Sequence, residues 1–136
     1  SAASDVYKRQ IPGIGPIAAT AIAALAPPPE HFKRARDFAA WLGLTPRQMS
    51  TGGKQKLGSI SKMGERTLRR LLIIGSSAVV LHANCRGAAP GSWLGRMLAR
   101  KARMLVIVAQ ANKTARIVWA VLMKKEDYRT PVAAAA

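Results

Sequence analysis

A glycine-rich, basic segment from Pro46 to Leu72 places the strongest constraint on how this chain folds. It reads PRQMSTGGKQKLGSISKMGERTLRRLL, and Glu65 is its only acidic residue. Glycine allows a backbone to approach a phosphate closely, and cationic side chains neutralise the phosphate charge. We therefore expect residues 45–60 to form a loop suited to phosphate, with the hydroxyls of Ser50 and Thr51 at its centre, followed by a helix.

Helical periodicity dominates the sequence on both sides of this loop. Aromatic residues and alternating β-branched residues are scarce, and no Asn-Gly turn signal is present. Pro16 suits the first turn of a helix, Gly43 suits a helix C-terminus, and Ser92 suits an N-cap. The sequence predicts an all-α fold, a compact bundle of about five helices. The helices are expected over residues 16–26, 34–42, 61 or 62 to 84, 93–100 and 102–124.

One domain is expected between two uninformative ends. Residues 1–10 show no periodic pattern and are interpreted as a disordered leader, foreign to the rest of the chain. Residues 11–128 form the domain, and residues 129–136 are a tail. Cys85 is the single cysteine, which excludes a disulfide framework and favours a reducing cytoplasm.

Charge narrows the classes of partner. Lysine and arginine number 22 against 6 acidic residues, which gives a net charge of +16. A compact fold with this charge repels itself unless a polyanion binds it, so nucleic acid is the first expected partner and an anionic membrane surface the second. The apolar stretch over residues 104–122 is interrupted by polar and charged side chains, which argues against a membrane span.

The segment IPGIGPIAATAI, which begins at Ile11, resembles the turn of a helix-hairpin-helix motif. In that motif, glycines such as Gly13 and Gly15 flatten the turn, and the amides that open the next helix point at a phosphate. Residues 11–26 are therefore expected to form a helix-hairpin-helix-like element that grips a nucleic-acid backbone. The alternative is a tight turn between helices that only packs.

Ser50 has two interpretations. A serine hydroxyl is a poor nucleophile until a base, a metal or a preorganised phosphate activates it, and only His31 and His82 are available as imidazoles. The acidic residues are scattered, so no metal site is expected in this chain. From the residues alone, the loop favours a phosphate cradle. The residues expected to bind DNA or RNA phosphates are Gly13, Gly15, Gly52, Gly53, Lys54, Lys56, Lys62, Arg66, Arg69 and Arg70.

The late helix also allows two interpretations. Asn112 and Arg116 share a face, so they could form a ridge that contacts phosphate or RNA. A core helix with one solvated edge is the favoured interpretation. Trp41, Trp93 and Trp119 are expected to fill the core and not to stack on bases.

Three blocks of the sequence together carry a family resemblance. They are PGIGPIAATAIAAL, then FAAWLGLTPRQMSTGGKQKLGSISKMGERTLRRLLIIGSSAV, then ANKTARIVWAVL. Over residues 11–128 the chain closely resembles the C-terminal transposase domain of the insertion-sequence DEDD/serine transposases, the bridge-RNA-guided recombinases. The resemblance implies that a serine of this domain attacks a DNA phosphate during transposition and recombination. Carried onto this chain, the nucleophile is Ser50, with Thr51 as its rival.

The same resemblance implies parts that this sequence does not contain. An N-terminal RuvC-like domain carries four acidic residues that bind Mg²⁺, and a guide (bridge) RNA supplies specificity. It also implies a homo-oligomer in the bacterial cytoplasm, associated with the nucleoid and not with membrane. This chain alone is then expected to bind DNA without cutting it. The alternative functions are a non-enzymatic helix-hairpin-helix module and a cationic protein acting on a membrane or on ribosomal RNA.

Overall fold

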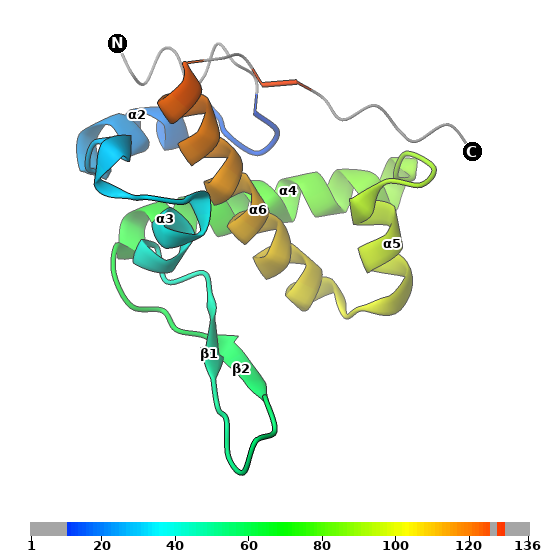
Figure 1. The fold of residues 1–136 in the computed structure, drawn as a ribbon. Coiled ribbons are helices and arrows are strands. Elements are labelled where there is room, and N and C mark those ends of the chain that lie inside the picture. The colour runs from blue at the N-terminus through cyan, green and yellow to red at the C-terminus, as the bar shows by residue number, and fades with distance from the viewer. Residues whose placement is uncertain (1–10, 126–127, 130–136) are drawn as a thin grey trace.

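A computed structural model describes residues 11–125 and 128–129 of the chain, which form a helical bundle with one projecting β-hairpin (Figure 1). The helices of this part are α2 (Pro16–Leu25), the short 3₁₀ helix η1 (Pro29–His31), α3 (Ala35–Trp41), α4 (Arg66–Arg86), α5 (Trp93–Arg100) and α6 (Arg103–Lys124). The strands are β1 (Pro46–Gln48) and β2 (Leu57–Ile60). The mostly helical fold is confirmed. The expected leader over residues 1–10, and most of the tail, lie outside the described residues.

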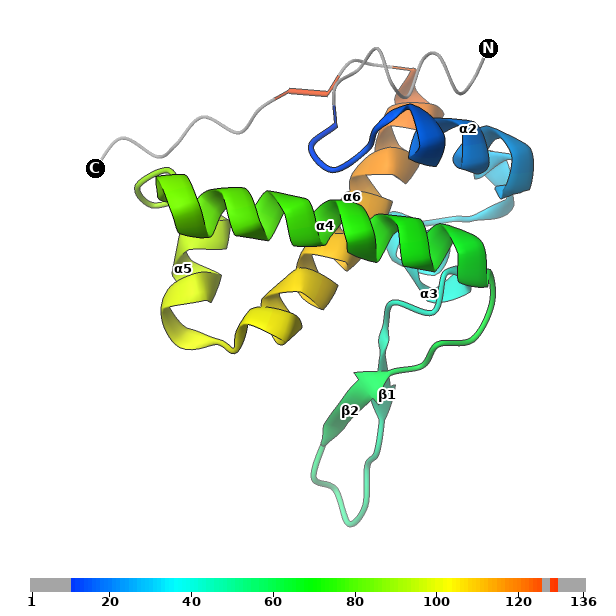
Figure 2. The same cartoon turned by 180° about the vertical axis from the view of Figure 1, so that it is seen from behind.

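The two long helices, α4 and α6, cross each other and organise the bundle (Figures 1 and 2). Helix α2 packs on α4, α3 packs on α6, and α5 joins the end of α4 to the start of α6. Figure 2 shows the molecule turned by 180° about the vertical axis, so its top and bottom are the same in both views. In both, α2 lies at the top of the molecule and the hairpin at the bottom.

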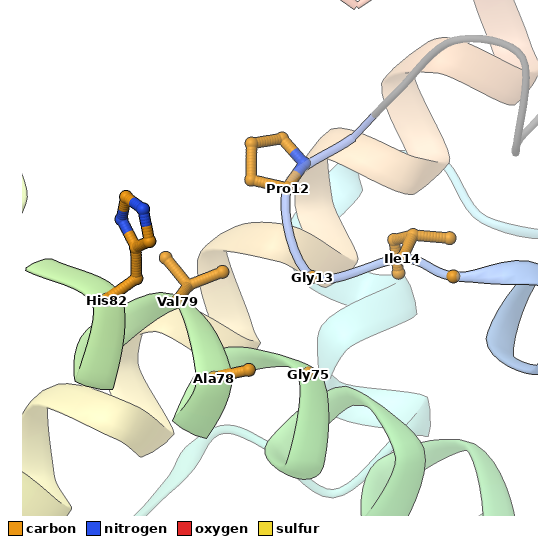
Figure 3. Close-up of a pocket in the computed structure, with 8 residues that line it drawn as sticks. Pro12, Gly13, Ile14, Gly75, Ala78, Val79 and His82 are labelled. Atoms are coloured by element: carbon orange, nitrogen blue, oxygen red, sulfur yellow. The ribbon is translucent and has the colours of Figure 1, made fainter.

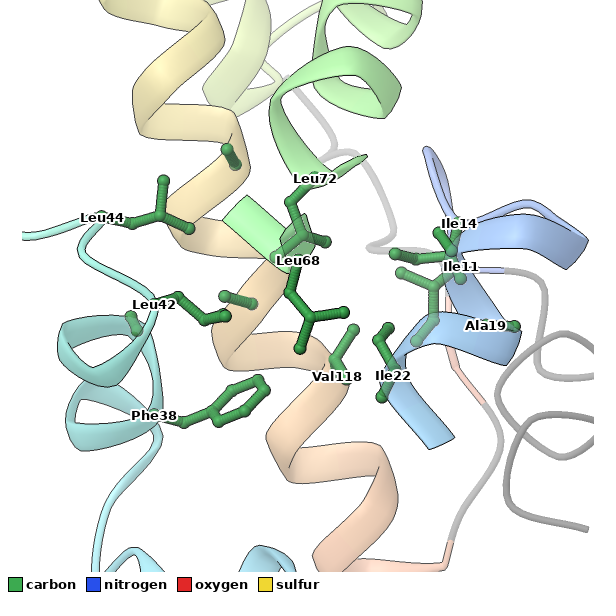
Figure 4. Close-up of a cluster of buried hydrophobic side chains, with 14 of the residues drawn as sticks. Ile11, Ile14, Ala19, Ile22, Phe38, Leu42, Leu44, Leu68, Leu72 and Val118 are labelled. Carbon is green, nitrogen blue, oxygen red and sulfur yellow. The ribbon is translucent and has the colours of Figure 1, made fainter. Parts of the chain in front are cut away.

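The main core lies where α2, α3, α4 and α6 meet (Figure 4). Leu68 and Leu72 of α4 are buried against Val118 of α6 and Ile22 of α2. Burying a large aliphatic side chain contributes about 1.5–3 kcal/mol, so this cluster supplies much of the driving force for folding. A second, smaller cluster forms under α5 from Val80, Val106 and Ile107, with partly buried α5 side chains packed on it.

Helix boundaries follow from capping residues in the sequence. The Ser92 side chain accepts a hydrogen bond from the amide of Gly95 at 3.1 Å, which confirms Ser92 as the N-cap of α5. The carboxylate of Glu65 accepts from the amide of Thr67 at 3.0 Å and starts α4. Helix α6 is long and apolar enough to span a membrane by composition, yet Val106, Ala111, Val118 and other residues of one face are buried in the core.

The expected loop over residues 45–60 is wrong, because the chain forms an antiparallel β-hairpin there. The expected start of the next helix at residue 61 or 62 is also wrong, since α4 begins at Arg66. Lys62 has φ 55° and Gly64 has φ 86°, and these left-handed conformations prevent the helix from extending back to β2. The helix ends at Arg86, slightly beyond the expected residue 84.

The turn before α2 packs closely on the middle of α4 (Figure 3). Gly13 has φ 86°, and a Cβ added to it would lie 3.2 Å from the carbonyl carbon of Gly75. A Cβ added at Gly75 would overlap the carbonyl oxygen of Gly13. This close approach explains why α4 carries a glycine in its interior, where glycine is about 1 kcal/mol less favourable than alanine.

Replacing Gly75 with alanine is therefore expected to destabilise the protein, although alanine is the better helix former. The added Cβ must displace the backbone at Gly13, and overpacking of this kind costs about 1–3 kcal/mol. Urea unfolding followed by circular dichroism measures the change. Gly15→Ala is the control, because nothing lies within 4 Å of a Cβ at that position, and its loss of stability should be limited to the cost of alanine at the N-cap of α2. Equal stability of Gly75→Ala and the parent chain would contradict this packing.

Candidate nucleic-acid interface

The hairpin ends in a tight turn of two glycines. Thr51 and Lys54 form a β-bridge, and the Lys54 amide donates to the Thr51 carbonyl at 3.2 Å. Gly52 and Gly53 lie between them with φ 60° and 79°. Positive φ at both central positions is the geometry of a type I′ turn, whose twist matches that of the two strands. The glycine pair is therefore required by the hairpin itself.

Below the turn, the strands pair through an irregular ladder. The Met49 amide donates to the Lys56 carbonyl at 2.7 Å, and Gln48 pairs with Leu57. Pro46 pairs with Ile60, so two residues of β2 lie opposite one residue of β1, as in a β-bulge. The hairpin extends away from the helices in both views of the molecule (Figures 1 and 2), which leaves its distal half exposed to solvent.

The base of the hairpin is tied to the junction between α3 and α4. A guanidinium nitrogen of Arg69 donates to the carbonyls of Leu42 at 3.2 Å and Met63 at 3.4 Å. Gly43 and Gly64 fit here because a Cβ at either would overlap a carbonyl oxygen, that of Met63 or Trp41. The base is thus fixed by backbone contacts, and Arg69 supports it.

Contacts from β1 and α6 reinforce the same junction. The Arg47 guanidinium donates to the Ser61 carbonyl at 3.1 Å, and the Asn112 side-chain amide donates to the Leu44 carbonyl at 3.0 Å. Asn112 therefore contributes to the fold, as expected of a core helix with one solvated edge. Arg116 is exposed on the same helix.

Ser50 and Thr51 lie next to the glycine turn, and both are exposed. His82 lies on α4 and lines a pocket together with Pro12 of the turn before α2 (Figure 3), and His31 belongs to η1, so neither imidazole is part of the hairpin. Across residues 11–125 and 128–129, no three His, Cys, Asp or Glu side chains gather as a metal site. The described residues therefore present an accessible alcohol without a metal site of their own.

The expected phosphate-binding residues are not brought to one place. Lys54 and Lys56 are exposed on the far half of the hairpin, while Arg66 and Arg70 are exposed on the first turns of α4. Lys62 lies between these two groups, in the segment that joins β2 to α4. These exposed cations therefore follow one another along the chain from the hairpin onto α4 (hereafter the hairpin–α4 strip), and do not form a compact cluster.

The turn before α2, which contains Gly13 and Gly15, lies at the other end of the molecule from the hairpin (Figures 1 and 2). Gly13 packs against Gly75 of α4. This contact agrees with the alternative interpretation, in which the turn packs between helices and does not bind phosphate. Gly15 is exposed, and it precedes α2 without a side-chain cap. Any phosphate contact by this turn is therefore separate from the hairpin.

Sequence reasoning missed Arg47, which belongs to β1 and lies in the same basic segment as the expected lysines. It named Arg116 on a possible phosphate-binding ridge but did not join this ridge to α5. In the structure the Lys113 ammonium of α6 lies 4.4 Å from the centre of the Trp93 ring of α5. Desolvation, and then the charges of Arg116 and Arg96, lower the pKa of Lys113. Helical spacing in the sequence indicates which of these residues share a face of one helix. It does not indicate that α5 and α6 lie next to each other.

Comparison with known proteins gives the family. Residues 9–90 match the family described as Transposase IS116/IS110/IS902, which is more than half of the chain. The chain belongs to this transposase family. The match covers α2, the hairpin and all of α4.

Relatives in this transposase family extend the similarity toward the C-terminus. The chain is 51% identical over 119 residues to a Pseudomonas aeruginosa protein described as a family 20 transposase, covering 88% of this chain and 35% of that protein. It is 39% identical over 121 residues to the Coxiella burnetii transposase for insertion sequence element IS1111A, covering 89% and 33%. It is 40% identical over 111 residues to the Yersinia enterocolitica transposase for IS1328, covering 82% and 33%. The chain thus spans about a third of the length of these transposases.

The neighbouring arginines Arg69 and Arg70 are expected to behave differently when each is replaced by alanine. Arg69→Ala removes the donors to Leu42 and Met63, so the free energy of unfolding should fall by about 1–2 kcal/mol. Arg70 is exposed, so Arg70→Ala should change it by less than about 0.5 kcal/mol. Chemical denaturation of both variants measures the difference, and equal losses would contradict the role of Arg69 at the hairpin base.

Proposed function

We propose that this chain is the catalytic-serine and DNA-binding domain of an insertion-sequence transposase, acting in DNA transposition and recombination. The observation that carries the proposal is the placement of Ser50, which is exposed beside a two-glycine turn on a cationic hairpin. Membership of the transposase family supports it, because proteins of that family described as transposases include this region.

In this proposal the hairpin–α4 strip binds the DNA backbone. Lys54, Lys56 and Lys62, together with Arg66 and Arg70, neutralise successive phosphates without reading the base sequence. Gly52 and Gly53 keep the tip of the hairpin free of side chains, so that a phosphate can approach the backbone closely. Arg69 supports the hairpin, and is not proposed as a phosphate ligand.

Ser50 is proposed as the nucleophile. Its Oγ attacks a DNA phosphorus, a phosphoserine ester forms, and one strand oxygen leaves and takes up a proton. The serine proton passes to a base outside the described residues, because no imidazole belongs to the hairpin. The neighbouring lysines stabilise the negative charge that develops on the phosphate. Thr51 is the alternative nucleophile, being exposed at the same turn.

The remaining parts of the proposal concern the rest of a full-length transposase. The described residues do not fit a metal site, so the acidic residues that hold Mg²⁺ are proposed to belong to a RuvC-like domain elsewhere in the protein. A guide RNA, a homo-oligomer and a location in the bacterial cytoplasm at the nucleoid complete the proposal. The chain alone is expected to bind DNA and not to cleave it.

The roles of the two hydroxyls can be separated in a protein of the relatives' length that carries this domain. Ser50→Ala should abolish the covalent protein–DNA product on a denaturing gel while DNA affinity stays unchanged, because only the attacking oxygen is lost. Thr51→Ala serves as the matched control and should retain the product. Loss of the product in Thr51→Ala with its retention in Ser50→Ala would assign the reaction to Thr51, and retention in both would refute serine attack from this hairpin.

The binding role of the hairpin can be measured with the chain alone. Replacing Lys54 and Lys56 by alanine should weaken duplex DNA binding for all sequences and reduce the slope of log affinity against log salt by about 2. Lys124→Ala with Arg129→Ala removes the same charge as a control, since α6 ends at the top of both views, away from the hairpin. Fluorescence anisotropy at several salt concentrations gives both slopes, and equal changes would indicate binding by net charge alone.

A further inference from the structure

A groove of about 710 Å³ lies between the hairpin and the N-terminal half of α6. Leu57 lines it from the hairpin, Leu105 and Met104 line it from α6, and Trp93 lines it from the start of α5. Leu57 is 64% exposed, Met104 60% and Leu105 51%. Large apolar side chains gathered on a surface in this way mark a place where another molecule binds.

The rim of this groove is cationic. Lys101 and Arg116 are part of its lining, which contains no acidic residue. Lys113 lies over the Trp93 ring, and Arg96 and Arg116 act on Lys113 through their charges. Within residues 11–125 and 128–129, the one ion pair joins Arg34 and Asp37 at the N-terminus of α3, away from the groove lining. The cations at the groove are therefore left for a ligand to neutralise.

The apolar lining of the groove and its cationic rim together indicate which kind of ligand it binds. A duplex keeps its bases stacked inside, so it offers phosphates but cannot fill an apolar groove. An unpaired strand offers flat bases and phosphates side by side, and proteins bind such strands with aromatic side chains beside a cationic track. Trp93 provides the aromatic ring at this groove, while Lys101 and Arg116 provide the charges.

We propose that the groove between the hairpin and α6 binds an unpaired nucleic-acid strand, with bases against Trp93 and Leu105 and phosphates on Lys101 and Arg116. This inference rests on the proposed function, because it assumes a chain that handles nucleic acid. It adds a second binding surface to the hairpin–α4 strip, and assigns single strands to one surface and duplex to the other. Since the hairpin forms one wall, a strand in the groove lies close to the base of the element that carries Ser50.

The test compares binding of the whole chain to labelled oligo(dT), oligo(rU) and a duplex of the same length. Leu105→Ser should lower affinity for the single strands by about tenfold, because it removes apolar surface from the groove, and should leave duplex affinity unchanged. Leu81→Ser is the matched control, since Leu81 is a similarly exposed leucine on α4 outside the groove. Arg116→Gln should weaken strand binding more than Arg86→Gln, which lies at the end of α4.

Trp93→Ala should also weaken strand binding by about tenfold. If this variant loses its helical circular dichroism, Leu105→Ser still decides, because its side chain is half exposed and not part of the core. The proposal is supported if the affinity for oligo(dT) or for oligo(rU) falls in Leu105→Ser. The oligonucleotide that binds more tightly shows whether the groove prefers DNA or RNA. The proposal is overturned if strand affinity is unchanged in folded Leu105→Ser, if strand and duplex affinity fall equally, or if only an acidic amphipathic peptide binds in a Leu105-dependent way. Failure of the proposed function would appear separately, as duplex binding that does not depend on Lys54 and Lys56.

Discussion

The backbone junction between α3 and α4 is the constraint on which the rest of this structure depends. Two glycines, Gly43 and Gly64, bring the entry and the exit of the hairpin against neighbouring carbonyls so closely that no Cβ fits. Arg69 then donates across the gap to both segments. The Glu65 amide also reaches back to the Trp41 carbonyl at 3.4 Å, which links the cap of α4 to the end of α3. Because the junction holds both strands, the direction of the hairpin is set by the helical bundle.

Within one basic segment, some cations stabilise the fold and others remain exposed to solvent. Arg69 and Arg47 each donate to backbone carbonyls, so the junction uses part of the positive charge. Lys54, Lys56 and Arg70 remain exposed and available for an anion. The charge on α5 and α6 forms another surface, where Lys113 is held over Trp93. The excess of cations in this chain is thus divided among distinct structural roles, which the net charge alone does not reveal.

The helices could be predicted from the sequence because their signals are local. The three- and four-residue spacing of apolar side chains located the helices, and the hydroxyl of Ser92 located the start of α5. The hairpin was missed because β2 is short, contains Gly58 and pairs through a bulge, so it shows little alternation. The Gly52-Gly53 pair was the available turn signal, and it was interpreted instead as a place where the backbone can approach a phosphate closely.

The site residues could be predicted only in part, because long-range contacts decide what each one does. Arg69 and Arg70 are adjacent and chemically identical, yet only the fold directs one of them to the hairpin base. Gly13 matched a phosphate-binding pattern, but its partner is Gly75, far along the chain. Trp41 packs on Phe38 with 6.0 Å between ring centres, and Trp119 donates to the Pro29 carbonyl at 3.0 Å, as expected of core side chains. Trp93 instead lines a groove.

The hairpin is held at its base and exposed at its tip, so a small rotation at the base moves the tip by a larger distance. A strand rises about 3.3 Å per residue, so the tip stands roughly 17 Å beyond Pro46, and a tilt of about 5° at the base would sweep the tip through about 1.5 Å. Reacting groups tolerate misplacement of about 1 Å poorly. If Ser50 is the nucleophile, as we propose, then Gly43 and Gly64 at the base of the hairpin govern the position of its hydroxyl, because they fix the junction from which the hairpin extends.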